Sequence, residues 1–408
     1  MIIRGQIIDG TGSDPIEKGA VVVSSGRILE IGPEKDAETP KSETEVINAS
    51  GKTIIPGLVD AHVHFCLNQG FEPLNEYAVG MSTLYGVENA RRWINAGITT
   101  VRDVGCKHRG VYALRQEIDL GRVAGPRMLV AGRIISQSGR TYIEKGGMSV
   151  PADGADEVRK VAREELGAGA DWVKVYASGQ GVGPKPRDPW DVWMTVEEIS
   201  AACDEAHSKG KKAAAHAINA ESAMNCIKGG IDSIEHGLLL NDDALEEMKK
   251  HNVYYVPTIF TYYIDGQLPI ERCYKFKPQD AWIQDRLRNK ELPFHAHNVK
   301  RATEIGVKIV AGTDIPEPIE EGNIIRADAM AQELILMVKY GLTNMHALRT
   351  ATQTAAEMLG LEQEIGTLEK GKAADLIILN GDPLMNMNAV LPENISLVMK
   401  EGRIIRRQ

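Results

Sequence analysis

Two histidines separated by one residue, His62 and His64, stand at the end of an apolar run that follows the Pro56-Gly57 break. In an extended strand alternate side chains point to the same face, so both imidazoles can bind one cation. Imidazole nitrogens are common ligands of zinc. A histidine in a buried strand is also often a hydrogen-bonded core residue, so the pair alone indicates a metal site only weakly.

Four further polar residues fall in or at the end of later strand candidates: Lys174, His216, His236 and Asp314. Each alone has a structural explanation, because a lysine can reach outward to solvent, core histidines are usually hydrogen-bonded, and an aspartate often caps a helix. Their joint occurrence is harder to explain in this way, since barrel enzymes carry their catalytic groups at the C-terminal ends of the strands. Together with the histidine pair they predict six ligands at one barrel mouth.

Lys174 lies in the apolar run Asp171–Gly179 and is expected to be buried. Burial of an ammonium group lowers its pKa and makes the neutral amine available to react with carbon dioxide. The resulting carbamate is an anion with two oxygens, which can bridge two cations. Four imidazoles and one aspartate would then complete the ligand set and leave a position open for water.

The central part of the chain alternates strand candidates with amphipathic helical stretches, a pattern that favours βα units around a parallel sheet. We expect an α/β fold, a closed (β/α)8 TIM barrel, over residues 57–362, with long connections at about 136–155, 179–194 and 260–290. An open doubly wound sheet is the alternative, but the GxGxxG turn typical of that fold is missing after the first strand. The eight strand candidates are Gly57–Phe65, Ile98–Val104, Arg127–Ile135, Trp172–Ala177, Lys212–Ala217, Ser233–His236, Tyr254–Ile259 and Lys308–Asp314.

Both chain ends consist of short β-rich runs separated by Gly, Asp and Ser turns. Residues 1–56 and 363–408 share this pattern and are expected to pair into one small β-sandwich domain that is discontinuous in sequence. The barrel domain is therefore expected to lie between the two parts of the sandwich. Within the barrel domain, Thr195 followed three residues later by Glu198 predicts a helix that begins with a capping box.

The composition of the 408-residue chain argues against some classes of function. Its 47 Lys and Arg against 56 Asp and Glu give a formal net charge of −9, which disfavours a nucleic-acid-binding surface. No apolar stretch is long enough to cross a bilayer and the N-terminus has no apolar signal segment, so we expect a cytoplasmic protein without a membrane partner. The five cysteines are odd in number, have no CxxC spacing and are expected to be reduced thiols.

The motifs resemble those of the amidohydrolase superfamily. The resemblance lies in Val59–His64, the strand lysine, the two later strand-end histidines and Gly312–Asp314, and it extends over nearly the whole chain to Lys370–Leu384. Further motifs are similar to the branch of prolidase-like metal-dependent dipeptidases, amino-acid carboxypeptidases and ochratoxin-type amidases, with imidazolonepropionases as more distant relatives. These motifs are Gly97–Asp103, Gly125–Arg127, Ile234–Gly237 and Val256–Thr258.

The resemblance implies two Zn2+ ions, or other divalent metals, held between the strand ends. A zinc-bound hydroxide would attack a substrate carbonyl, with Asp314 as the general base that passes the proton to the leaving nitrogen. His236 and Tyr262 would complete the catalytic residues. The implied ligands are His62, His64 and Asp314 for one zinc and His216 and His236 for the other, with carboxylated Lys174 as the bridge.

The resemblance favours hydrolysis of an amide (C–N) bond in a small substrate such as an Xaa-Pro dipeptide or an N-acyl amino acid. Single-metal deaminases of the superfamily usually carry a glutamate three residues after the strand-five histidine, where this chain has Asn219. Two departures weigh against peptidase activity. Ile218 stands where the dipeptidases commonly have a tyrosine, and Ser136–Tyr142 stands where they have a Gly-Gly-His-Gly stretch.

The substrate is expected to carry a carboxylate. Tyr262 is a candidate donor to that carboxylate or to the developing oxyanion, with packing under a lid as the equal alternative. Three basic loop residues would suit the carboxylate and four aromatic residues would form an apolar wall of the pocket. They are Arg140, Lys185 and Arg187, and Trp190, Trp193, Tyr263 and Trp282.

Two other functions stay open at the level of sequence. The same fold could support a single-metal reaction, such as the opening of a cyclic amide by an imidazolonepropionase-like enzyme. A non-catalytic barrel that binds a ligand is the second alternative, because a fold alone does not determine a function. In each case we expect a homo-oligomer with a small-molecule partner.

Overall fold

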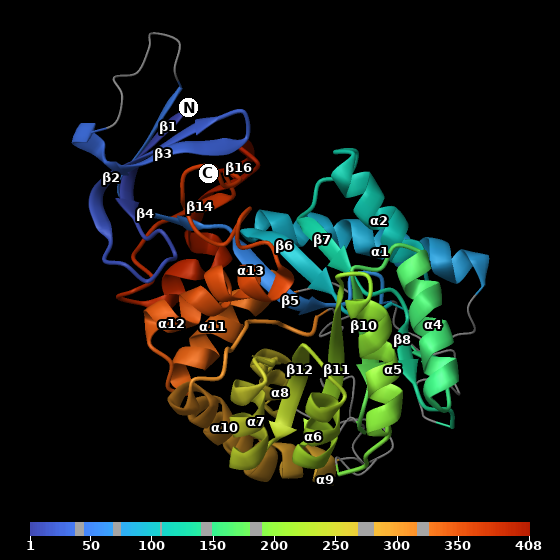
Figure 1. The fold of residues 1–408 in the computed structure, drawn as a ribbon. Helices are drawn as coiled ribbons and strands as arrows, with labels where there is room; N and C mark the ends of the chain where they lie inside the picture. The colour runs from blue at the N-terminus through green and yellow to red at the C-terminus, as the bar shows by residue number, and fades with distance from the viewer. Residues whose placement is uncertain are drawn as a thin grey trace.

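The computed structural model describes residues 1–36, 45–67, 75–106, 108–139, 149–179, 190–267, 281–315 and 326–408. In this part of the chain, strands and helices alternate through the middle, while both ends contribute strands to a separate sheet (Figure 1). The protein is therefore a mixed α/β structure, as the pattern of the sequence predicts.

A seven-stranded sheet joins the two ends of the chain. Its strands, in spatial order, are β16 (Arg403–Arg407), β15 (Ile395–Lys400), β14 (Leu376–Leu379), β4 (Val46–Pro56), β1 (Ile2–Ile7), β2 (Ile16–Ser24) and β3 (Arg27–Pro33). β4 pairs parallel with β1 and antiparallel with β14, so segments far apart in sequence are neighbours. Side chains from both ends, among them Ile3, Ile54 and Ile378, pack into one apolar cluster.

Two further sheets consist only of parallel strands. One has the order β5 (Leu58–Val63), β6 (Ile98–Asp103) and β7 (Arg127–Val130), and the other has the order β13 (Tyr254–Val256), β12 (Ser233–Leu239), β11 (Lys212–Asn219), β10 (Trp172–Tyr176), β8 (Ile134–Ser136) and β9 (Ser149–Pro151). Every residue of β5, β6, β10 and β12 is buried. Burial on both faces is typical of parallel strands covered by helices, which explains their nearly continuous apolar sequences.

The segment 308–315 lies between these two parallel sheets. The amide of Val310 donates to the carbonyl of Tyr255 in β13 (2.8 Å), and the amide of Ala61 in β5 donates to the carbonyl of Ala311 (3.0 Å). The sequence predicts a regular strand here, but the structure has only isolated bridges to the neighbour on each side. The ladder is interrupted because the amide of Ala311 donates to the carbonyl of Thr350 (3.0 Å), the last residue of a later helix, and not to a neighbouring strand.

The single strand predicted over Arg127–Ile135 is wrong, because the structure has two strands there, β7 and β8, in different sheets. Gly132 separates them with a positive φ of 74°. A Cβ at this position would collide with the hydroxyl of Tyr112 and the carboxylate of Glu165. Glycine is therefore needed both for the backbone conformation and for the close approach of the two side chains.

Helices lie beside the parallel strands (Figure 1), and α5 begins with the predicted capping box of Thr195 and Glu198. No helix of the described residues is long and apolar enough to span a membrane. The helices are α1 (Glu76–Asn95), α2 (Gly110–Asp119), α4 (Ala155–Gly167), α5 (Val196–His207), α6 (Ala220–Lys228), α7 (Asp242–Lys250), α8 (Ile259–Gln267), α9 (Ala281–Arg286), α10 (Leu292–Ile305), α11 (Ala329–Lys339), α12 (Asn344–Thr350) and α13 (Gln353–Leu359). Short 3-10 turns span Glu34–Asp36, Met387–Val390 and Pro392–Asn394, and Leu287–Glu291 is a π-helical turn.

Candidate metal centre

Two histidines of β5 and its following turn lie next to one aspartate, close enough to hold a metal ion together. The Nε2 atoms of His62 and His64 are 3.3 Å and 3.2 Å from Oδ1 of Asp314. One ligand atom from each of the three residues lies within 4.8 Å of the others. Both histidines are buried and the side chain of Asp314 is 16% exposed, so a cation held here would be largely shielded from water.

His216 and His236 lie beside this group. They belong to the neighbouring parallel strands β11 and β12, and their ring centroids are 4.5 Å apart. The ring of His236 is in turn 4.9 Å from the ring of His62. The structure therefore brings the four predicted histidines together next to Asp314, near the carboxyl ends of the parallel strands.

One nitrogen of each imidazole contacts a group outside this cluster. Such a partner fixes the ring and its tautomer and leaves the other nitrogen for a metal. The contacts are His62 Nδ1 with Glu235 Oε2 (2.7 Å), His64 Nδ1 with the Gly105 carbonyl (2.8 Å), His216 Nε2 with the Gly179 carbonyl (3.2 Å) and His236 Nδ1 with Thr258 Oγ1 (2.8 Å).

Glu235 joins the cluster to a buried positive charge. Nη2 of Arg102 donates to both of its carboxylate oxygens, at 2.8 Å and 2.9 Å, and both side chains are fully buried. Burial alone would raise the pKa of the Glu235 carboxyl. The charge of Arg102 and the hydrogen bond with His62 lower this pKa by more, so its net shift is downward and Glu235 is ionised. The sequence motifs do not predict the pair of Arg102 and Glu235, although a charged residue inside each of two apolar strands is a signal for it.

The amine of Lys174 on β10 is buried and has no hydrogen-bond partner among the described residues. Because burial disfavours its charged form, the pKa of this amine falls from 10.5 to about 8. Roughly a tenth of the amine is then neutral at pH 7. Together with the imidazole and carboxylate donors, an unpaired amine of this kind fits a divalent metal centre with a carboxylated lysine.

Three residues of the centre have left-handed backbone conformations. The φ angles are 73° at His236, 47° at Thr258 and 58° at Asp314. Such a conformation is strained for residues with a Cβ, most of all for a β-branched threonine. The amide of Asp314 donates to the carbonyl of His62 (2.8 Å), which helps to hold this turn in place. Strain of this kind is concentrated at functional sites.

Tyr262 on α8 lies edge-on against His236, with ring centroids 5.7 Å apart. It belongs to a buried apolar cluster with Ile218 and Leu238, each two residues after a histidine of the centre. The surroundings of Tyr262 beside these histidines are therefore mostly apolar. Ile218, which stands where the dipeptidases commonly have a tyrosine, contributes to this apolar surface.

The other predicted substrate residues are spread over different environments. Trp193 is buried and Tyr263 is half-buried. Trp190 and Trp282 are 59% and 51% exposed, unlike the side chains of a closed apolar wall. The predicted basic residues Arg140, Lys185 and Arg187 lie outside the described residues.

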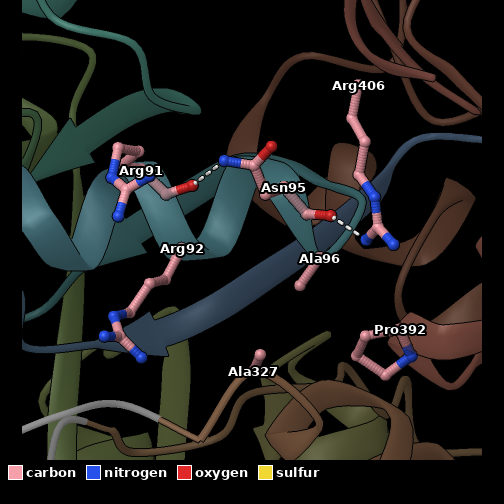
Figure 2. A pocket seen from close by; sticks show the side chains of 7 residues that line it. All are labelled: Arg91, Arg92, Asn95, Ala96, Ala327, Pro392 and Arg406. Carbon is pink, nitrogen blue, oxygen red and sulfur yellow. Dashed lines mark hydrogen bonds between the residues drawn. The ribbon is translucent and has the colours of Figure 1, made fainter. Parts of the chain in front are cut away.

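A separate hollow of about 430 Å³ lies at the C-terminal end of α1, and none of the predicted metal ligands lines it (Figure 2). Its arginines have local partners. Nη1 of Arg406 donates to the carbonyl of Asn95, and Arg91 and Arg92 both pair with Glu88. The hollow is thus distinct from the candidate metal centre.

Histidines and an aspartate gathered near the carboxyl ends of buried parallel strands are the arrangement of metal-dependent hydrolases with a barrel-type α/β fold. Residues 53–405 match the sequence model of the amidohydrolase family, and the chain belongs to this family. The protein is therefore a hydrolase of the TIM-barrel type of fold, in a family that generally uses divalent metals.

Relatives of known activity confirm the predicted kinship within the family. Ochratoxinase of Aspergillus niger is 26% identical over 442 residues, which cover 100% of this chain and 86% of that protein. Imidazolonepropionase of Sphingopyxis alaskensis is 27% identical over 404 residues, which cover 90% and 88%. The crystal structure of a Xaa-Pro dipeptidase with methionine bound in its active site is 28% identical, with a TM-score of 0.84 and coverage of 99% and 98%.

Proposed function

We propose that this amidohydrolase is a binuclear zinc enzyme that cleaves an amide (C–N) bond in a small carboxylate-bearing substrate, such as an Xaa-Pro dipeptide or an N-acyl amino acid. The observation that carries the proposal is the buried, unpaired amine of Lys174 in the same site as four imidazoles and Asp314. The similarity to a Xaa-Pro dipeptidase and to ochratoxinase supports the type of bond.

The proposed ligands divide into two sets with one shared member. When bound, the two ions would lower the pKa of a water molecule and polarise the carbonyl of the substrate. Glu235 and Thr258 would keep the rings of His62 and His236 oriented for this task. The sets are His62, His64 and Asp314 for one ion and His216 and His236 for the other, with carboxylated Lys174 between them.

Asp314 is the proposed general base. Burial raises the pKa of its carboxyl, but the neighbouring His62, His64 and His236 lower it well below its usual value, so the carboxyl is ionised and can act only as a base. It would take the proton of the attacking water and hand it to the leaving nitrogen. The hydroxyl of Tyr262 would donate to the substrate carboxylate or to the developing oxyanion.

Metal analysis and a substrate screen test this proposal together. Protein grown with zinc should contain two zinc ions per chain, and its intact mass should exceed the sequence mass by about 44 Da from the carboxylated lysine when measured without acid. A screen of N-acyl amino acids, dipeptides and lactams should reveal amide hydrolysis. K174A should lose the second zinc and the activity, and short carboxylic acids should restore part of both. Full zinc content and full activity in K174A would contradict the proposal.

A single-metal hydrolase is the second candidate. Among the described residues, only His62, His64 and Asp314 place three ligand atoms within 4.8 Å of one another, which favours one ion over two. The similarity to imidazolonepropionase supports the opening of a cyclic amide as the reaction of such an enzyme. One metal per chain, an unmodified Lys174 and cleavage of a lactam in the screen would select this candidate.

A further inference from the structure

His295 is a histidine whose side chain is completely inaccessible to solvent. Among the described residues neither ring nitrogen makes a hydrogen bond of regular geometry, although the backbone of His236 lies close to the ring. A buried polar group in this condition destabilises the folded protein, because it has given up its bonds to water without replacing them. An unsatisfied buried group in a native structure therefore requires an explanation.

The position of His295 connects it to the candidate metal centre. The ring of Tyr262 contacts the rings of both His236 and His295, with centroid distances of 5.7 Å and 6.0 Å. Both contacts are nearly perpendicular, at 82° and 89°. His295 thus lies beside Tyr262, with the backbone of His236 also close to its ring.

The helix that carries His295 has an irregular start. α10 follows directly on the π-helical turn Leu287–Glu291, and such turns are frequent at functional sites. Glu291 lies one helical turn before His295, and its carboxylate pairs with Arg286 through Oε1 (2.8 Å) while Oε2 is buried without a hydrogen bond among the described residues. The spacing of four residues places the side chains of Glu291 and His295 on one face of a helix.

Apart from the backbone of His236, the surroundings of His295 and Tyr262 are mostly apolar. Tyr262 belongs to an apolar cluster with side chains of the helical stretch that also carries His295, including Ile283, Leu287 and Leu292. An apolar side chain in place of His295 would fill this environment without an unsatisfied nitrogen. Burial lowers the pKa of His295 to about 3 despite the nearby carbonyl of His236, so the ring is neutral and offers one N–H donor and one acceptor.

We propose that His295 is a positioning residue for Tyr262. When the substrate is bound, its free imidazole N–H donates to the hydroxyl oxygen of Tyr262, and the phenol hydrogen then points at the substrate. The hydrogen bond that is missing in the free protein is therefore made in the complex. This inference rests on the proposed function, because it assumes that Tyr262 contacts the substrate.

The first test is H295F, which keeps an aromatic ring beside Tyr262 and removes both nitrogens. Its melting temperature should equal or exceed that of the native protein, because an unsatisfied polar group has been removed. Its kcat/KM for the amide found in the screen should fall by about 10- to 100-fold, as expected when a substrate-contacting group is misaligned. F294L, at the exposed neighbouring position of the same helix, is the control and should change neither quantity.

A double-mutant cycle tests the route of the effect. If His295 acts only through the hydroxyl of Tyr262, H295F should have no further effect on kcat/KM in a Y262F background. A fall of the same size in both backgrounds would overturn the proposal, as would native kcat/KM in H295F. A clear fall in the melting temperature of H295F would also overturn it, because the nitrogens would then support the fold.

These outcomes separate the inference from the proposed function. If the native protein cleaves amides and H295F is equally active, only the inference fails. If the native protein cleaves no amide, the proposed function fails, and the melting temperature of H295F decides about His295. A higher value supports an imidazole held for function, and a lower value assigns it a structural role.

Discussion

At the scale of single residues, the sequence predicts the types of side chain at the centre but not what orients them. The spacing of His62 and His64 indicates a shared face because side chains alternate along a strand. The contacts of Glu235 with His62 and of Thr258 with His236 depend on how distant strands are placed, which local patterns do not contain. Thr258 itself has a positive φ of 47°, a conformation that a β-branched residue rarely adopts.

Thr258→Val tests the importance of such an orienting contact. Valine keeps the branched shape but removes the hydroxyl that contacts Nδ1 of His236, so the ring loses its only described side-chain hydrogen bond. We expect zinc affinity to fall by about 10- to 100-fold, as measured by competition with a chromogenic chelator. Thr303→Val, in the last turn of α10, removes a hydroxyl that donates to the carbonyl of Val299 and should leave the affinity unchanged. Equal affinities for all three proteins would show that Thr258 does not orient a ligand.

At the scale of elements, local signals are predictable and long-range ones are not. The capping box at Thr195 is written in four consecutive residues, and the structure confirms it. The division of Arg127–Ile135 at Gly132 depends on Tyr112 and Glu165, which approach the turn from α2 and α4. For the same reason, the irregular pairing of the segment 308–315 cannot be predicted from its strand-like sequence alone.

Glu165 on α4 connects three elements, and its charge should be visible in the pH dependence of stability. It accepts hydrogen bonds from Arg133, Arg109 and the hydroxyl of Tyr112. Burial raises the pKa of its carboxyl, but the contacts with Arg133 and Arg109 lower it below the ordinary value of 4.5. A lowered folded-state pKa stabilises the protein above pH 4.5, and this stabilisation is lost as the pH falls through the folded-state value.

We therefore expect Glu165→Gln to be destabilised most strongly near pH 7, by roughly 2–3 kcal/mol, because a charged hydrogen-bond acceptor is lost. The difference from the native protein should shrink as the pH falls below 4.5 and through the lowered folded-state pKa, where the native carboxyl itself becomes protonated. Melting temperatures between pH 3 and pH 8 measure this effect. Glu164→Gln, which removes a more exposed carboxylate 3.6 Å from Arg133, is the matched control and should follow the native curve. A constant difference for Glu165→Gln across this range would contradict the prediction.

At the scale of the whole molecule, the most informative feature is the sheet shared by both chain ends. The similar β-rich patterns of the two ends suggest that they pair, and β4 and β14 are neighbours in the structure. The pairing register follows from packing in a common apolar cluster, which the sequence does not specify. The closed barrel over 57–362, the two-part sandwich of 1–56 and 363–408, the homo-oligomer and the cytoplasmic location stay predictions.

Arg127 links this sheet to the parallel strands. From β7, its Nη1 donates to Asp375 (2.9 Å) and its Nη2 to Glu401 (2.7 Å), both near strands of the C-terminal segment. The side chain of Asp375 is only 4% exposed. Removing a partner from a buried ion pair destabilises by about 3–5 kcal/mol, because the remaining charge is left uncompensated. Arg127→Met should therefore weaken the coupling between the sheet and the rest of the molecule.

Spectroscopy can resolve this coupling, because all five tryptophans lie between Trp93 and Trp282 and none lies in the seven-stranded sheet. Tryptophan fluorescence thus follows the central part of the chain, whereas far-ultraviolet circular dichroism follows all of it. We expect the two signals to change together when the native protein is unfolded with urea, as in a cooperative transition. In Arg127→Met the dichroism should begin to fall at a lower urea concentration than the fluorescence. Arg122→Met breaks an exposed pair with Glu117 and should unfold like the native protein, because such pairs contribute little. Coincident transitions in Arg127→Met would mean that the apolar contacts alone hold the sheet and the central part together.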